Sequence, residues 1–265
     1  MQPMLNGATR VFAIVGDPIA QVQSPAHVTR AFAERGENAI LVPAHVTPAD
    51  LDAFLAGIAR ARNVDGIIVT VPHKFACFRH CTEVTDRARF LGAVNVMRRT
   101  ADGWAGDMVD GLGFVGGIRA EGFEPEGKSA LLVGAGGAGT AIALSLLEAG
   151  VRDLAIHDED TARRDTLVGR LRERFGGAVR AGEPDPAGYD LVANATPAGM
   201  RPGDPLPVPV ERLERTTFVG CVITAPAASP LVVAARGLGC RTQVGGGMFA
   251  NLLGLMVDFL LAGKR

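Results

Sequence analysis

Short apolar segments rich in Val and Ile alternate with longer amphipathic segments along the chain. The apolar segments have the length of strands, and the amphipathic ones have the apolar spacing of helices. In the first hundred residues this pattern predicts strands at 10–16, 38–46, 65–71 and 93–99, and helices at 25–35 and 48–62. A Ser-Pro or Thr-Pro pair precedes each helix, and we expect it to form the N-cap.

A second series of strands and helices begins near residue 129. The predicted strands are 129–134, 153–157, 190–194, 218–223 and 241–244, and the predicted helices are 138–149, 162–175 and 231–236. Alternation of strand and helix is typical of parallel sheets that are covered on both faces. The chain is therefore predicted to be an α/β protein with two lobes, each built on an open sheet, and a ligand cleft between them.

Composition narrows the class of protein. Hydrophobic residues make up 48% and charged residues 21%, with a net charge of −1. This balance is ordinary for a soluble globular protein, and it offers no excess of basic residues to bind nucleic acid. The longest apolar stretch, 248–261, contains Asn251 and Asp258 and is too short to span a bilayer. The N-terminus lacks signal-peptide features, so we expect a cytoplasmic protein without membrane association.

Cysteines raise the question of a metal. Cys77, His80 and Cys81 are close enough to share a helix face, but no second cluster of ligands occurs in the chain. Four cysteines also make no disulfide framework in a chain of 265 residues. We predict buried, reduced thiols and no metal site.

A glycine-rich segment at 134–139 follows a predicted strand and leads into a helix. Gly134 permits a tight turn, Gly136 lets the backbone approach a pyrophosphate, and Gly139 lets the helix pack closely on the strand. The helix N-terminus attracts the anion. In this context the segment predicts dinucleotide binding, and the alternative is a tight turn without a ligand.

The next predicted strand ends in an acidic run that bears on the choice of cofactor. Asp158 lies about twenty residues beyond the glycines, where an acid accepts hydrogen bonds from the ribose hydroxyls of NAD. The 2′-phosphate of NADP would be repelled by Asp158, Glu159 and Asp160, although Arg163 and Arg164 follow. NAD is therefore the expected cofactor and NADP the alternative. The alternative explanation of the acidic run is structural: it supplies the N-cap of the following helix, for which Asp160 alone is sufficient.

Seven further segments complete a pattern that covers the chain from end to end. They are 16–20 (Gly-Asp-Pro-Ile-Ala), 24–27 (Ser-Pro-Ala-His), 65–74 (Asp-Gly-Ile-Ile-Val-Thr-Val-Pro-His-Lys), 92–95 (Gly-Ala-Val-Asn), 107–114 (Asp-Met-Val-Asp-Gly-Leu-Gly-Phe), 194–200 (Asn-Ala-Thr-Pro-Ala-Gly-Met) and 245–248 (Gly-Gly-Gly-Met). With the glycine loop, these segments resemble the ordered motifs of the shikimate/quinate dehydrogenase family. The resemblance implies that residues 1–105 form the substrate-binding lobe, completed by the C-terminal helix 241–265. It also implies that residues 106–240 form a Rossmann-like dinucleotide-binding lobe.

The resemblance also implies roles for individual residues. In this family a Lys–Asp pair transfers the proton while hydride moves to or from the nicotinamide, and the matching residues are Lys74 and Asp110. The chain has 24 arginines and three lysines, so a lysine at position 74 indicates a need for an amine that can lose its proton. Ser24, Thr70 and Asn95 match substrate-binding positions, although Ser24 also suits an N-cap and Thr70 a strand. The cofactor-binding positions that we infer from the glycine loop, the acidic run and the resemblance are Gly134, Gly136, Gly137, Ala138, Gly139, Asp158, Asn194, Thr196, Gly245 and Met248.

Several family positions have lost a polar side chain. This chain has Val22 for a usual Ser, Ile68 for Asn, Met108-Val109 for Asn-Thr, Thr224 for Tyr and Leu252 for Gln. Each lost hydrogen bond to a substrate oxygen weakens binding by about 1–3 kcal/mol. We therefore expect shikimate to bind poorly unless a nearby amide of Gln21, Gln23 or Asn251 restores a contact.

Three hypotheses follow. The leading one is an NAD(P)-dependent oxidoreductase of the shikimate dehydrogenase type, acting on a small hydroxy or keto compound similar to shikimate or quinate. The second is an authentic NADP-dependent shikimate dehydrogenase of aromatic amino-acid biosynthesis. The third is a non-catalytic, dinucleotide-binding sensor or partner protein. Both a monomer and a homodimer fit the sequence.

Overall fold

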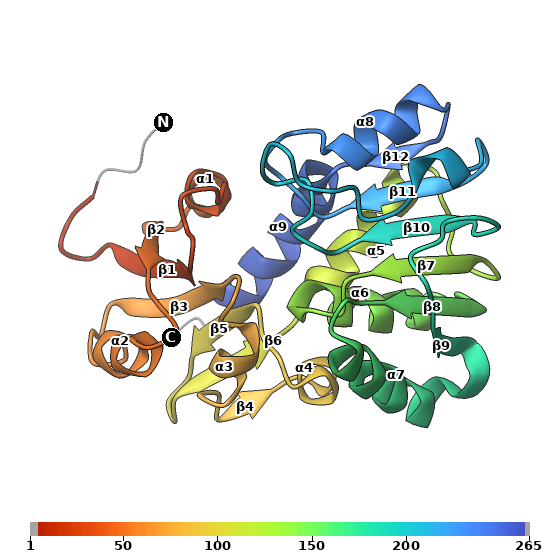
Figure 1. Ribbon diagram of the computed structural model, residues 1–265. Helices are drawn as coiled ribbons and strands as arrows, with labels where there is room; N and C mark the ends of the chain where they lie inside the picture. Colours follow the sequence, from red (N-terminus) through yellow and green to blue (C-terminus); the bar gives the residue numbers. More distant parts are fainter. Residues whose placement is uncertain (1–4, 263–265) are drawn as a thin grey trace. The chain divides into compact units, whose positions relative to one another are not determined.

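The computed structural model describes residues 5–262, which pack into two compact units (Figure 1). Residues up to Val109 and those from Leu253 onward form the first unit, and Asp110–Leu252 form the second. The predicted α/β fold class is confirmed, since each unit contains a six-stranded sheet with helices. None of the helices among residues 5–262 is long and apolar enough to cross a membrane.

The sheet of the first unit has the strand order β2-β1-β3-β5-β6-β4. The elements are β1 (Arg10–Gly16), α1 (Ser24–Glu34), β2 (Ala39–His45), α2 (Leu51–Ile58), β3 (Val64–Val69), α3 (Lys74–Phe78), β4 (Glu83–Val84), α4 (Asp86–Leu91), β5 (Val96–Arg99) and β6 (Trp104–Asp107). Strand β1 lies inside the sheet and is buried on both faces from Phe12 to Val15. This explains its continuous apolar sequence.

The sheet of the first unit is mixed, whereas the alternation of strands and helices indicated parallel sheets. Strand β5 pairs antiparallel with both β3 and β6. Only four residues join β5 to β6, with Thr100 N donating to Gly103 O at 2.9 Å. So short a connection reverses the chain, whereas a parallel crossover needs a dozen or more residues.

The predicted N-caps of the first two helices were also wrong. Gln23 is the N-cap residue of α1, and Ser24 is already its first helical residue. Helix α2 begins at Leu51, because Thr47 and Asp50 form a turn in which the Thr47 hydroxyl donates to the Asp50 carboxylate. Asp160, by contrast, caps its helix as expected, accepting from Arg163 N.

The second unit contains a parallel sheet with the order β12-β11-β10-β7-β8-β9. Its elements are α5 (Asp110–Ala120), β7 (Ser129–Val133), α6 (Gly137–Glu148), β8 (Asp153–His157), α7 (Thr161–Phe175), β9 (Val179–Ala181), β10 (Leu191–Asn194), β11 (Phe218–Cys221), α8 (Pro230–Gly237) and β12 (Thr242–Gln243), with two 3₁₀ turns at Gly176–Ala178 and Val210–Arg212. Counted from β7, this is the strand order 3-2-1-4-5-6 of dinucleotide-binding folds, read from the opposite edge.

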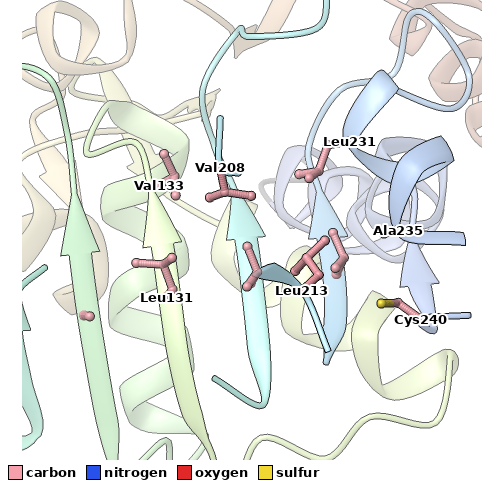
Figure 2. Packing of buried hydrophobic residues seen from close by; sticks show 10 residues of the cluster. Leu131, Val133, Val208, Leu213, Leu231, Ala235 and Cys240 are labelled. Carbon is pink, nitrogen blue, oxygen red and sulfur yellow. The ribbon is translucent and has the colours of Figure 1, made fainter. Parts of the chain in front are cut away.

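Two faces of this sheet are covered by different helices. Figure 2 shows Leu131 and Val133 of β7 on the face where Leu231 and Ala235 of α8 pack, and all four are buried. The opposite face meets α5, since a Cβ on Gly220 of β11 would lie 2.6 Å from the ring of Phe114. Successive residues of a strand point to opposite faces of the sheet, so a continuous run of apolar residues packs against the helices on both faces.

The last helix, α9 (Gly245–Leu261), contributes to both units. Its first half lies against α5, where a Cβ on Gly113 would be 2.9 Å from the Leu252 Cβ. Its second half lies against β3, where a Cβ on Gly66 would be 2.5 Å from Leu260. The two units therefore meet within this helix, between Leu252 and Leu253.

Candidate functional site

Loops of the first unit converge at one edge of its sheet. Parallel strands β1 and β3 end there, and because β5 runs antiparallel to β3, it begins there. Backbone hydrogen bonds link these segments: Val69 N donates to Asn95 O at 2.7 Å, and Asn95 N to Asp107 O at 2.9 Å. The edge thus gathers segments 70–74, 92–95 and 107–109, which carry Thr70, Lys74 and Asn95.

Lys74 begins α3 directly after the loop that follows β3. The carbonyl of Lys74 accepts from Val94 N at 3.0 Å, which ties the loop to segment 92–95. The neighbouring His73 is 1% exposed, and its Nε2 donates to Val46 O at 2.8 Å. Lys74 is half-buried, and hydrogen bonds hold the preceding loop at both ends. A side chain in such a fixed position is able to meet a substrate in one geometry.

The proposed substrate residues lie on the same unit. Thr70 N donates to Val15 O. A Cβ placed on Gly16 would lie only 2.4 Å from the methyl carbon of Thr70. Glycine at position 16 therefore makes room for Thr70. Ser24 is buried at the start of α1, following the loop after β1.

Asn95 has a role that the sequence did not indicate. Its side chain is buried, and Oδ1 accepts from Val109 N at 3.0 Å. It therefore holds the backbone immediately before Asp110, which is 4% exposed and begins α5 as the first residue of the second unit.

Four of the apolar side chains that stand where the family usually has a polar one are packed inside the protein. Ile68, Met108 and Val109 are buried in the first unit, and Leu252 packs over Gly113 in the second. The amides suggested as replacements are engaged elsewhere or exposed: Gln21 donates to Pro18 O, Asn251 donates to Gly247 O, and Gln23 lies on the surface.

The glycine loop lies at the switch point of the second sheet, between β7 and β10. Gly134 has φ +105°, and a Cβ there would lie 2.8 Å from the Ala195 carbonyl carbon, so the turn requires glycine. A Cβ on Gly139 would lie 1.9 Å from Gly134 O. Apart from its two chain neighbours, no described residue has an atom within 4 Å of a Cβ placed on Gly136, so packing does not require glycine there. The close approach of a pyrophosphate to the backbone at the start of α6 would require it, and the residues present fit a dinucleotide. Gly137 and Ala138, also predicted to bind the cofactor, form the first turn of α6.

Asp158 contacts this loop directly. The carboxylate is 6% exposed and accepts from Ala135 N at 2.6 Å, from Asp160 N at 2.9 Å and from Arg163 Nη2 at 2.6 Å. Burial would raise the pKa of this carboxyl, but the hydrogen bonds from Arg163, Ala135 and Asp160 outweigh burial, and the pKa lies below its ordinary value. The folded protein therefore favours the ionised form of the Asp158 carboxylate.

The remaining predicted cofactor residues shape the neighbouring loops. Asn194 is fully buried and accepts at Oδ1 from both the backbone N and the hydroxyl of Thr196, which is half-buried. Gly245 begins α9, where a Cβ would lie 2.3 Å from Ile223 O. Met248 follows in the same helix turn and is 7% exposed.

The cysteines are all free. Burial, with a smaller contribution from the neighbouring Cys81, raises the pKa of the Cys77 thiol to about 12, and burial raises that of Cys81 to about 12. Both thiols are therefore protonated at neutral pH. Within residues 5–262 no group of three His, Cys, Asp or Glu side chains is arranged to hold a metal ion.

Comparison with known proteins identifies the family. A family model described as the shikimate dehydrogenase substrate binding domain matches residues 14–97. A shikimate dehydrogenase (NADP(+)) of Rubrobacter xylanophilus is 38% identical over 248 residues, which cover 89% of this chain and 86% of that protein. This chain belongs to the shikimate/quinate dehydrogenase family. The predicted enzyme class is confirmed: the protein is an oxidoreductase of the shikimate dehydrogenase type, acting on a CH–OH group.

Two solved structures of similar proteins show the breadth of the family's fold. Quinate dehydrogenase from Corynebacterium glutamicum in complex with NAD is 28% identical, with a TM-score of 0.85 and coverage of 96% of this chain and 94% of that chain. The 5-ketofructose reductase of a Gluconobacter strain is also 28% identical, with a TM-score of 0.83 and coverage of 96% and 93%.

Proposed function

We propose that this shikimate dehydrogenase family member transfers hydride reversibly between NAD and a small hydroxy or keto compound, with Lys74 and Asp110 moving the proton. The observation that carries the proposal is the glycine loop at the switch point of the second sheet, with Asp158 bonded to it. In open α/β sheets this is the place where dinucleotides bind.

Oxidation of an alcohol to a carbonyl removes a hydride from carbon and a proton from the hydroxyl oxygen. A bound nicotinamide supplies the hydride acceptor. The Lys74 amine takes the hydroxyl proton, and it returns that proton to the carbonyl oxygen in the reverse direction. Asp110 is the acidic member of this proposed pair, and Thr70 and Ser24 donate or accept hydrogen bonds at the remaining substrate oxygens. The first unit would then be the substrate-binding lobe and the second the dinucleotide-binding lobe.

The proposed substrate carries fewer groups that need hydrogen bonds than shikimate does. Ile68, Val109 and Leu252 are buried and apolar, so they offer nothing to a carboxylate or a hydroxyl. The similar reductase from Gluconobacter is named for 5-ketofructose, a keto sugar without a carboxylate. This supports a family site that accepts compounds other than shikimate.

NAD is the proposed cofactor because of the acceptor sites on Asp158. An ionised carboxylate has about four lone-pair sites, and Ala135, Asp160 and Arg163 fill three of them. The remaining site, on Oδ2, suits one ribose hydroxyl. A 2′-phosphate at the same place would meet a buried negative charge.

The experiment replaces Lys74 by alanine, with Lys128→Ala as the matched control. Lys128 belongs to the second unit, and its side chain is half exposed beside Asp190. We expect Lys74→Ala to lower kcat at least about a hundredfold, because a general base contributes about 10²–10⁴. The NAD dissociation constant should stay within about twofold, since the glycine loop holds the cofactor. Turnover near that of the wild type would refute the assignment.

The second candidate function is that of an authentic NADP-dependent shikimate dehydrogenase. The 38% identity to a relative of that name favours it. A spectrophotometric assay of shikimate, quinate and a panel of small hydroxy acids and keto sugars, each with NAD and with NADP, separates the two. Efficient oxidation of shikimate with NADP, and not with NAD, would establish the second candidate.

A further inference from the structure

The three residues before Asp110 are held by side chains of the first unit. Asp107 ends β6, and Val109 is the last residue before the second unit begins. Met108 N donates to Asp107 Oδ1 at 2.7 Å, and Val109 N donates to Asn95 Oδ1 at 3.0 Å. Both backbone amides that precede Asp110 therefore have a fixed side-chain acceptor.

Asp107 is itself clamped by the first turn of α4. Its side chain is 3% exposed, and Arg87 binds it through two nitrogens, Nε to Oδ1 at 2.7 Å and Nη2 to Oδ2. The Thr85 hydroxyl donates to Oδ1 as well. Thr85 is also the N-cap of α4, accepting from Ala88 N, so the clamp cannot turn independently of that helix.

Four hydrogen bonds thus converge on a buried carboxylate, and its backbone partner within residues 5–262 is Met108 N, in the turn toward Asp110. A buried ion pair is weak evidence for stability, because desolvation offsets much of the attraction. A two-nitrogen arginine contact does, however, fix the plane of the carboxylate. Fixing that plane fixes the direction of the Met108 N–H, and with it the course of the chain.

We propose that Asp107, held by Arg87 and Thr85, is a positioning residue that sets the backbone from which Asp110 enters α5 and so aligns Asp110 for proton transfer. The inference rests on the proposed role of Asp110. Asp107 acts through Asp110, since the side-chain contacts that the structure gives it are with Thr85, Arg87 and Met108.

The test compares Asp107→Asn with Asp65→Asn. Asp65 pairs with Arg10 in the same unit, but at the start of β3, opposite the edge that carries Lys74. Shikimate and NAD serve as the probe pair, followed by absorbance of the reduced cofactor. We expect Asp107→Asn to lower kcat at least tenfold, with KM for shikimate within threefold and the NAD dissociation constant within twofold. Asp65→Asn should lower the melting temperature while leaving kcat within twofold.

Arg87→Lys is the second variant, in case Asp107→Asn does not fold. It keeps the positive charge and loses the two-nitrogen contact, so we expect a smaller loss of kcat at a melting temperature close to that of the wild type. If the kcat of both Asp107→Asn and Arg87→Lys stays within twofold while Asp110→Asn is impaired, the positioning role is overturned and the proposed function stands.

A double-mutant cycle identifies the route of the effect. Because Asp107 acts through Asp110, adding Asp107→Asn to Asp110→Asn should lower the residual kcat less than twofold. Multiplying losses would show that Asp107 acts elsewhere and would overturn the inference. Wild-type turnover by Asp110→Asn alone would instead overturn the proton-transfer pair, and the positioning role with it.

Discussion

Replacement of Asp158 by alanine tests both the loop and the cofactor preference. The substitution removes the only side-chain acceptor that the structure gives Ala135 N, and this amide belongs to a residue that is 1% exposed. An unpaired buried donor costs about 1–3 kcal/mol. The ion pair adds less than about 1 kcal/mol, since the Arg163 side chain is 49% exposed and screened by water. Together they amount to about 1–4 kcal/mol, or a fall in melting temperature of about 2–16 °C.

The same substitution changes cofactor binding in a defined direction. A hydrogen bond to a charged acceptor contributes about 1.5–3 kcal/mol, so losing the ribose contact should weaken NAD binding by about ten- to a hundredfold. NADP should lose much less, because the carboxylate that repels its 2′-phosphate is gone. The preference for NAD over NADP should therefore fall at least about tenfold.

Isothermal titration calorimetry with NAD and NADP measures the preference, and thermal unfolding measures the stability. Glu159→Ala is the comparison variant: it removes an exposed neighbouring carboxylate that adds to the repulsion of NADP, and it should lower the preference for NAD less than Asp158→Ala does. Arg163→Ala separates the ion pair from the loop contact and should preserve the preference for NAD. An unchanged NAD to NADP ratio in Asp158→Ala, combined with lower stability, would refute the cofactor reasoning and leave Asp158 a purely structural residue.

Three further predictions concern pH, substrate and packing. Because the folded-state pKa of Asp158 is lowered, its stabilisation is complete at neutral pH and is lost as the pH falls below about 4; the difference in melting temperature between wild type and Asp158→Ala should shrink over that range. The double substitution Val22→Ser and Leu252→Gln should raise kcat/KM on shikimate at least about tenfold in a protein that still binds NAD, and no gain would show that specificity lies elsewhere. Gly139→Ala should abolish NAD binding, measured by calorimetry, because its Cβ would lie 1.9 Å from Gly134 O, whereas Gly169→Ala on the open surface of α7 should bind NAD normally.

Much of the second unit could be predicted from the residues alone. Strands β7, β8 and β10 are nearly continuous apolar runs, and each is followed by a turn and a helix or loop of suitable length. Parallel sheets impose that local pattern on the sequence because both faces of each strand are buried. The requirement for glycine at position 139 is equally local, since its Cβ would meet Gly134 O within the same strand–turn–helix unit, whereas the Cβ of Gly134 would meet the Ala195 carbonyl of a distant segment.

The mixed sheet of the first unit could not be predicted in the same way. Strand β6 has four residues, and β4 has two, so neither carries enough periodicity to be distinguished from a loop. The reversal of β5 depends on the hydrogen-bond partners that it meets in space, and the apolar pattern of a strand is the same in either direction.

A sequence motif could predict a role for a single side chain, as for Lys74 and Asp110, whose roles stay predictions. It could not predict interactions that arise from pairing between distant residues. Asp107 and Arg87 are twenty positions apart, and the clamp exists only because α4 packs beside the end of β6. Asp158 was expected to meet a ribose, yet three of its acceptor sites serve the protein's own amides and Arg163. Local sequence specifies which groups are available to bond, whereas burial and the folding of distant segments specify which of them meet.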